Sequence, residues 1–269
     1  MSERRIAALR RAVRELEAAA LPHHVAAART TVEEAFARAM RALCAGGRLP
    51  GYDEVRAALD ACGTGAAHLL PLGWGREHFV HQFLAREFVD ALAGFIACLH
   101  RSPVLEVGGP ARAASRQPSS APLHPSPVLE VGAGRGDLAR ALRERGLPVV
   151  ATDDGSWLDG RRSWPGALPA DVEPLACTTA PARHRPGIVL CAWMPLGEDW
   201  TPAFRACPAV ADYILIGEGP GGCTGTPESF AAPPPWRRTS LRDIARWGLT
   251  RNADRAFSTS VYHFHRPAR

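Results

Sequence analysis

The sequence contains no lysine, and all 32 of its basic residues are arginine. With 27 acidic residues the formal net charge is +5. An arginine-only chain rich in alanine and proline indicates a GC-rich coding sequence more than selection for chemistry. The arginines are interleaved with acids, and no aromatic-and-basic motif of an RNA-binding module accompanies them. The positive charge is therefore weak evidence for nucleic acid, which we disfavour as a partner.

Paired cysteine motifs are also missing. The seven cysteines are an odd number without C-x-x-C spacing, which predicts neither a disulfide framework nor a zinc-binding cysteine site. His263 and His265 share one face of the last expected strand, but two ligands without a third do not make a metal site. We therefore expect no metal.

Long apolar runs are absent too. No apolar signal segment opens the chain, and no run is long enough to span a bilayer. We expect a cytoplasmic protein without a membrane partner.

The most informative segment is Val128–Leu142, VLEVGAGRGDLARAL. Its start reads as a buried strand that contains Glu130. Gly132, Gly134 and Gly136 then allow the backbone to turn sharply and to approach a ligand closely. A helix follows, and its first turn presents unpaired N–H groups. The segment predicts a site for a nucleotide-type cofactor.

The spacing of this motif separates two kinds of cofactor. A dinucleotide fingerprint, G-x-G-x-x-G, needs its third glycine where this chain has Asp137. The pattern from Glu130 to Gly136, E-x-G-x-G-x-G, instead resembles motif I of the class I S-adenosylmethionine-dependent methyltransferases. The resemblance implies that Glu130, Gly132, Gly134 and Gly136 hold the amino-acid end of S-adenosylmethionine.

Three acids farther along extend the resemblance, which covers residues 126–266. A second strand, Leu147–Thr152, ends on Asp153 and Asp154, about 20 residues after the glycines, where a doubly wound fold places the acid that binds ribose. The resemblance gives this role to Asp153. Asp154 is the alternative, or caps the turn before Gly155. Asp171 matches the family's acceptor for the adenine amino group.

The remaining elements complete an α/β pattern. Apolar runs predict strands at Ile188–Trp193 and Tyr213–Gly217, and helices are expected at Asp199–Arg205 and Ser240–Trp247. Leu249–Phe257 and Thr259–Phe264 are expected to close the chain as an antiparallel pair of strands. We predict a Rossmann-like, doubly wound, seven-stranded, mostly parallel sheet with an N-terminal helical cap. The expected domains are a cap over residues 1–100, a partial duplication and linker over 101–125, and a methyltransferase domain over 126–269.

Four helices are expected before the cofactor strand: Ser2–Leu21, Thr31–Cys44, Tyr52–Ala61 and Glu77–Leu99. The last carries an apolar stripe that should pack on the sheet. The family often places a substrate-shaping cap here, whereas a plain scaffold or a homodimer face are the alternatives.

A seven-residue sequence, SPVLEVG, occurs at Ser102–Gly108 and again at Ser126–Gly132. In the first copy Pro110 replaces the second loop glycine, which fixes φ and removes an N–H. We expect the second copy to be the cofactor strand and the first to be an added strand, a surface extension or a disordered loop.

Candidate catalytic groups gather at a loop-to-helix junction. His78 and His81 are three residues apart and share a helical face, and histidine suits proton transfer near neutral pH. Glu198 is the third candidate base. Trp74 is a candidate wall of the substrate pocket, and Arg76 a candidate contact for the cofactor carboxylate. Ordinary surface histidines at a helix start are the alternative.

The methyl acceptor should enter at the carboxyl ends of the strands. Trp193, Met194 and Trp200 after the fourth strand and Glu218 after the fifth are the candidate pocket residues. We predict methyl transfer to a small molecule or peptide, with O-methylation favoured, in a setting such as secondary-metabolite tailoring. The alternatives are a nicotinamide-dependent oxidoreductase and a non-catalytic binding subunit.

Overall fold

The computed structural model describes residues 3–18, 30–40, 48–62, 71, 75, 80–101, 126–156, 167–251 and 259–267. Residues 30–40 are helical, and the named helices are α1 (Glu3–Glu17), α3 (Tyr52–Asp60), α5 (Arg86–Arg101), α6 (Asp137–Arg143), α7 (Ala180–His184), α8 (Thr201–Ala206), α9 (Arg242–Ala245) and the 3-10 helix η2 (Pro227–Phe230). The strands are β1 (Gln82–Phe83), β2 (Val128–Val131), β3 (Val149–Asp153), β4 (Val172–Pro174), β5 (Ile188–Ala192), β6 (Asp212–Gly217), β7 (Arg237–Ser240), β8 (Leu249–Thr250) and β9 (Ser260–His265).

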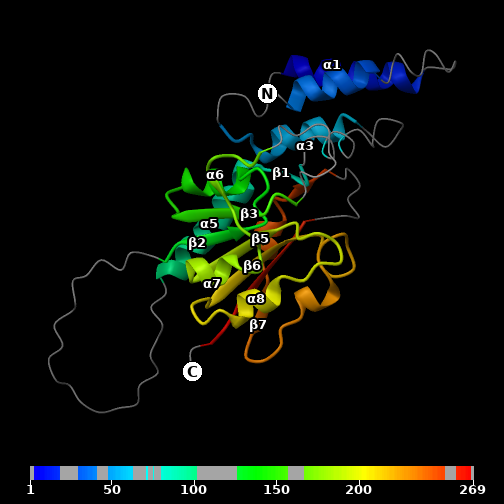
Figure 1. The fold of residues 1–269 in the computed structure, drawn as a ribbon. Helices are drawn as coiled ribbons and strands as arrows, with labels where there is room; N and C mark the ends of the chain where they lie inside the picture. The colour runs from blue at the N-terminus through cyan, green and yellow to red at the C-terminus, as the bar shows by residue number, and fades with distance from the viewer. Residues whose placement is uncertain are drawn as a thin grey trace, which may run out of the picture.

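Seven strands form one mixed sheet in the order β4-β3-β2-β5-β6-β9-β7. The first five run parallel, and β9 is antiparallel to both β6 and β7. The expected α/β class and the seven-stranded, mostly parallel sheet are therefore confirmed (Figure 1). The second SPVLEVG copy supplies β2 near the centre of this sheet, while the first copy lies outside the described residues.

Both faces of the sheet are buried. Alternate residues of β2 and β5 belong to two separate apolar clusters, as strands covered on both sides require. One cluster packs against α5, α6 and α9, and the other against α7 and α8. The apolar stripe of α5 lies in the first cluster through Phe88 and Leu92, which are fully buried, so its predicted packing on the sheet is confirmed.

The N-terminal helices form a third apolar cluster of their own, which includes Leu9, Phe36 and Val55. In Figure 1, α1 and α3 lie above the sheet, at one end of the molecule. Phe83 of β1 and Leu249 of β8 belong to the same cluster, and the two strands pair antiparallel. A short second sheet therefore joins the N-terminal helices to the C-terminal part of the chain.

Several predicted elements were wrong. The expected helix Glu77–Leu99 contains strand β1, and α5 begins only at Arg86. The expected helix Ser240–Trp247 shrinks to the four residues of α9, because the exposed residues Arg237–Ser240 form edge strand β7 instead. The segment after Gly248 was expected to pair with the last strand, but β8 pairs with β1 while β9 inserts between β6 and β7.

No helix within the described ranges is both long and apolar enough to cross a membrane.

Candidate cofactor and acceptor site

Most of the predicted site residues that the structure describes gather at one edge of the sheet. Strands β2, β3, β5 and β6 are parallel, so their carboxyl ends meet at the same edge. The chain moves outward from β2 to β3 and β4, then returns to place β5 on the other side of β2. The strand order therefore reverses between β2 and β5, and ligands of open α/β sheets bind outside the carboxyl ends of strands at such a reversal.

The loop after β2, residues 132–136, is called the β2 loop here. Gly132, Gly134 and Gly136 all have positive φ, at 63°, 55° and 70°, a region that side chains with a Cβ rarely adopt. A Cβ on Gly132 would lie 2.8 Å from the ring of Trp200. A Cβ on Gly134 would meet no atom within 4 Å, so this part of the loop faces open space. Gly134 is thus the position at which a ligand can approach the backbone.

Asp153, at the end of β3, is bound directly to this loop. Its Oδ2 accepts a hydrogen bond from the Gly134 N–H at 2.8 Å, and its Oδ1 accepts one from Gly155 at 2.7 Å. Its exposed fraction is 4%. The exposed Asp154 accepts from the N–H of Ser156, inside its own turn. The geometry therefore ties Asp153 to the β2 loop and gives Asp154 the turn-capping position.

Glu130 lies beneath the loop, on the α6 side of β2. Its exposed fraction is 3%, and it accepts a hydrogen bond from the Ala139 N–H. Its Oε2 is buried without a hydrogen-bond partner among the described residues. Burial raises the pKa of Glu130 to about 8, against the opposing effect of that hydrogen bond and of Arg143. The side chain is therefore a buried, mostly protonated acid at neutral pH.

Asp171 and Asp137 belong to a cluster of ion pairs with α6. The Asp171 carboxylate is 3.1 Å from Arg140 and 2.9 Å from Arg143, and Asp137 also pairs with Arg140. Burial would raise the pKa of Asp171, but the charge of Arg140 and the hydrogen bonds from Arg140, Arg143 and the backbone together outweigh it, and the pKa is lowered. Asp171 thus ties β4 to α6, and the structure gives no contact that favours the predicted adenine role.

On the β5 side of the strand-order reversal, the side chains of Trp193, His81 and Gln82 meet. The Trp193 ring stacks on that of His81, with centroids 5.6 Å apart and planes inclined by 20°. The Trp193 indole N–H donates to Oε1 of Gln82 at 3.2 Å. Trp193 has a positive φ of 60°, a strained conformation for a side chain of this size. Two residues predicted separately, His81 and Trp193, are therefore brought together.

Gln82 completes this set and was not predicted. It belongs to β1, and its Nε2 is buried without a hydrogen-bond partner within the described part of the chain. Because Oε1 already accepts from Trp193, the amide is oriented and its N–H groups point elsewhere. No local sequence pattern signals this role, because Gln82 falls within the expected helix Glu77–Leu99.

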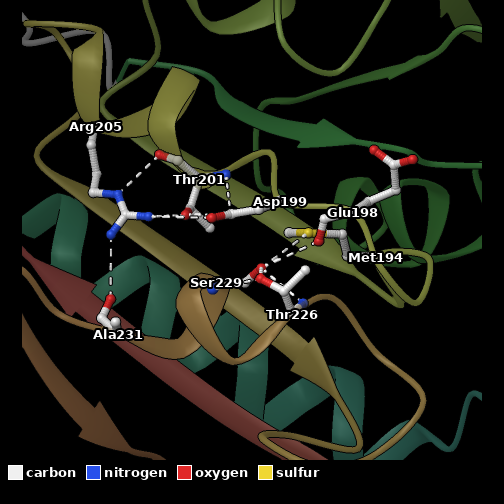
Figure 2. Close-up of polar contacts among 8 residues, drawn as sticks. All are labelled: Met194, Glu198, Asp199, Thr201, Arg205, Thr226, Ser229 and Ala231. Carbon is white, nitrogen blue, oxygen red and sulfur yellow. Dashed lines mark hydrogen bonds and ion pairs between the residues drawn. The ribbon is translucent and has the colours of Figure 1, made fainter.

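The segment after β5 is held by hydrogen bonds from Ser229 of η2 (Figure 2). Met194 is buried, and its sulfur lies 3.8 Å from the Ser229 hydroxyl, which also donates to the Glu198 carbonyl. Asp199 caps the start of α8 through the N–H of Thr201. Met194 is thus a core residue that anchors the segment. The Glu198 carboxylate is exposed and points away from the other side chains drawn.

The segment that starts at the last residue of β6, residues 217–225, is called the β6 loop here. It is also glycine-rich, but its own side chains fill the space beside Gly217 and Gly222. Glu218 Oε2 accepts from the Cys223 N–H at 2.7 Å, and Thr224 accepts from the Glu218 N–H at 3.1 Å. Glu218 therefore stabilises this loop.

The predicted residues Trp74, Arg76 and His78 lie outside the described residues. Cys177 was missed by sequence reasoning: its sulfur lies 3.6 Å from the Cβ position of Gly132, and burial raises its pKa to about 12. It is an inert part of the wall beneath the β2 loop.

Comparison with known proteins adds no family: no protein-family model matches the chain, and a search of curated proteins finds no similar one.

Proposed function

We propose that the chain is an S-adenosylmethionine-dependent methyltransferase with a Rossmann-like, doubly wound sheet, acting on a small molecule or peptide. The observation that carries the proposal is the contact between the β2 loop and Asp153 at the strand-order reversal. The insertion of antiparallel β9 between β6 and β7 agrees with the reversed final strand expected from the family resemblance.

The residues present fit this cofactor. Gly134 leaves room for a ligand against the backbone, and Asp153 is a carboxylate of the kind that accepts hydrogen bonds from ribose hydroxyls. Trp200 forms an apolar wall beside Gly132. Glu130 acts as a positioning residue, because it ties β2 to α6 beneath the loop. When bound, the cofactor supplies an electrophilic methyl group on a sulfonium.

A dinucleotide fits less well. Its pyrophosphate would need hydrogen-bond donors at the first turn of the helix after the glycines. That turn instead begins with the carboxylate of Asp137, which pairs with Arg135 and Arg140. Neither arginine is left as an uncompensated charge for phosphate.

For the acceptor, we assign orientation to Trp193, Gln82 and His81. A buried amide N–H without a partner costs free energy that a hydrogen bond to an acceptor's oxygen would recover. A flat ring beside it offers an apolar contact. An oxygen nucleophile held there would have His81 as its nearest candidate base, which is why O-methylation is the favoured reaction.

Calorimetric titration with S-adenosylmethionine, S-adenosylhomocysteine and NAD tests the proposal, with Asp153→Ala and Asp154→Ala as a matched pair. We expect both sulfur compounds to bind the native protein. Loss of a charge-assisted hydrogen bond should weaken binding about 10- to 100-fold in Asp153→Ala and less than about twofold in Asp154→Ala. Binding of NAD alone would replace the proposal with redox chemistry, and binding of none of the three would favour a non-catalytic subunit.

A further inference from the structure

A cluster of metal-ligating side chains lies at the amino end of β6, at the opposite edge of the sheet from the β2 loop. Oδ1 of Asp212 is 2.7 Å from Nε2 of His263 and 2.9 Å from Nδ1 of His265. The three ligand atoms all lie within 4.8 Å of one another. His263 and His265 alone are two ligands without a third, which is why no metal was expected. Asp212 supplies the third ligand.

Strand register explains how the cluster forms. Asp212, the first residue of β6, pairs directly with His265 of β9, and His263 is two residues away on the same face of β9. Phe95 of α5 packs edge-on against His263 at 5.1 Å, which holds this ring from the apolar side. Three side chains are therefore fixed on two hydrogen-bonded strands.

The burial of the three groups differs in a way that suits a metal. The Asp212 and His263 side chains are 13% and 12% exposed, whereas the His265 side chain is 48% exposed. Two ligands are thus largely buried and held in place, and the third stands beside solvent, which provides an entry path and room for a bound water.

We propose that Asp212, His263 and His265 bind a divalent transition metal, with Zn²⁺ as the best match to the donor set. Two imidazoles and one carboxylate, with a further position open to water, are a common ligand set for zinc. In a tetrahedral zinc site with normal bond lengths, neighbouring ligand atoms are about 3.3 Å apart. The distances from Asp212 Oδ1 to the two histidine nitrogens must therefore lengthen by about 0.5 Å when the metal binds. The exposed His265 makes that movement easy. The metal would join β6 to β9 independently of the proposed methyl transfer.

Two neighbouring groups bear on this site. His100, in α5, has a buried Nε2 without a hydrogen-bond partner in the described ranges, and the charge of Asp212 acts on its imidazole. Arg237 lies opposite His265 on β7, and its charge opposes a bound cation. Removing this charge should therefore tighten metal binding.

The test uses the full chain without an affinity tag, stripped with a chelator, and titrated with Co²⁺ and Zn²⁺. We expect one Co²⁺ per chain, with the visible d–d absorption of a site that contains nitrogen ligands, displacement by Zn²⁺, and a raised Tm. His265→Ala, at an exposed position, and Asp212→Asn should each weaken binding about 100-fold or more. Arg237→Gln should strengthen it a few-fold.

His184→Ala is the matched control, because His184 pairs with a single carboxylate, Glu173, and has no second histidine in that contact. It should leave the Co²⁺ spectrum and affinity unchanged. The proposal is overturned if the native chain shows no d–d absorption at millimolar Co²⁺, or if His265→Ala and Asp212→Asn bind as tightly as the native chain.

Discussion

The β2 loop and the β6 loop lie at the same edge of the sheet and are both rich in glycine, yet they differ in what occupies the space that glycine leaves. In the β6 loop, a Cβ on Gly217 would lie 2.4 Å from Thr224, and one on Gly222 would lie 2.4 Å from Glu218. In the β2 loop, a Cβ on Gly134 would meet nothing within 4 Å. Gly217 and Gly222 make room for the protein itself, as do Gly132 and Gly136, whereas the half-buried Gly134 and the exposed Gly221 face open space.

The acids beside the two loops, Glu218 and Glu130, also differ in burial and in their hydrogen bonds. Glu218 is partly exposed and its Oε2 accepts from the Cys223 N–H. Glu130 is buried, and its Oε2 has no hydrogen-bond partner within the described residues. A glycine-rich sequence beside an acid therefore does not by itself identify a ligand site.

The largest expected effect is a pH-dependent gain in stability for Glu130→Gln. Because the pKa of Glu130 is raised from 4.5 to about 8, the folded state binds the proton more tightly than the unfolded state does. This group's contribution to native stability is complete below pH 4.5 and is lost as pH rises through 8. The loss corresponds to about 5 kcal/mol as an upper bound.

Glutamine cannot ionise, so the variant should lose none of this stability. Urea unfolding at pH 5, 6, 7 and 8 should show the free energy of unfolding of Glu130→Gln rising relative to the native protein at each step. Parallel pH profiles for the two proteins would mean that Glu130 is ionised in the folded state.

Next in size is Gly217→Ala in the β6 loop. The added methyl group would collide with the buried Thr224, and overpacking of this kind typically costs about 1–3 kcal/mol. Chemical denaturation should report this loss, while calorimetry should find the affinity for S-adenosylmethionine changed by less than about twofold. A large drop in affinity would show that the β6 loop contacts the cofactor.

Gly134→Ala, in the β2 loop, should weaken the binding of S-adenosylmethionine, which Gly217→Ala should leave nearly unchanged. Its matched control is Gly146→Ala, after α6, since both glycines have positive φ and open space around them. Both variants should lose about 1–2 kcal/mol of stability through backbone strain. Only Gly134→Ala should also bind S-adenosylmethionine about tenfold more weakly, because its methyl group occupies ligand space. Equal affinities for the two variants would remove the β2 loop from the proposed site.

Glu218→Gln should have the smallest effect. Its amide oxygen can still accept from the Cys223 N–H, and the side chain is partly exposed. We expect a change in the free energy of unfolding below about 0.5 kcal/mol. A larger loss would show that the negative charge of Glu218 is needed to hold the β6 loop.

The sequence was sufficient to predict the elements with strong local patterns. Strand β5 is a continuous apolar run, β2 is apolar apart from Glu130 and β6 is apolar after Asp212. The glycines follow the end of β2, and Asp153 ends β3. Strand β7 could not be found in this way, because all four of its residues are exposed and carry no apolar alternation. It exists because β9 offers it an edge to pair with.

Sites assembled from distant segments were beyond the sequence. Gln82 and Trp193 are 111 residues apart, and Asp212 and His263 are 51 apart. Their meeting depends on strand register, which a local pattern does not specify. The ion pairs of Asp171 with Arg140 and Arg143 were not predicted either, because they join residues 31 and 28 positions apart, and its adenine contact stays a prediction.

The pairing of β1 with β8 has a consequence for the order in which the protein can be completed during synthesis. Gln82 pairs with Thr250, and the His81 carbonyl accepts from the N–H of Arg251, so His81 and Gln82 are held by residues that leave the ribosome after strands β2 to β7. The β2 loop and β3 can assemble much earlier. A nascent chain arrested before β8 should therefore already contain the glycine loop and its aspartate, but not a properly held His81 and Gln82.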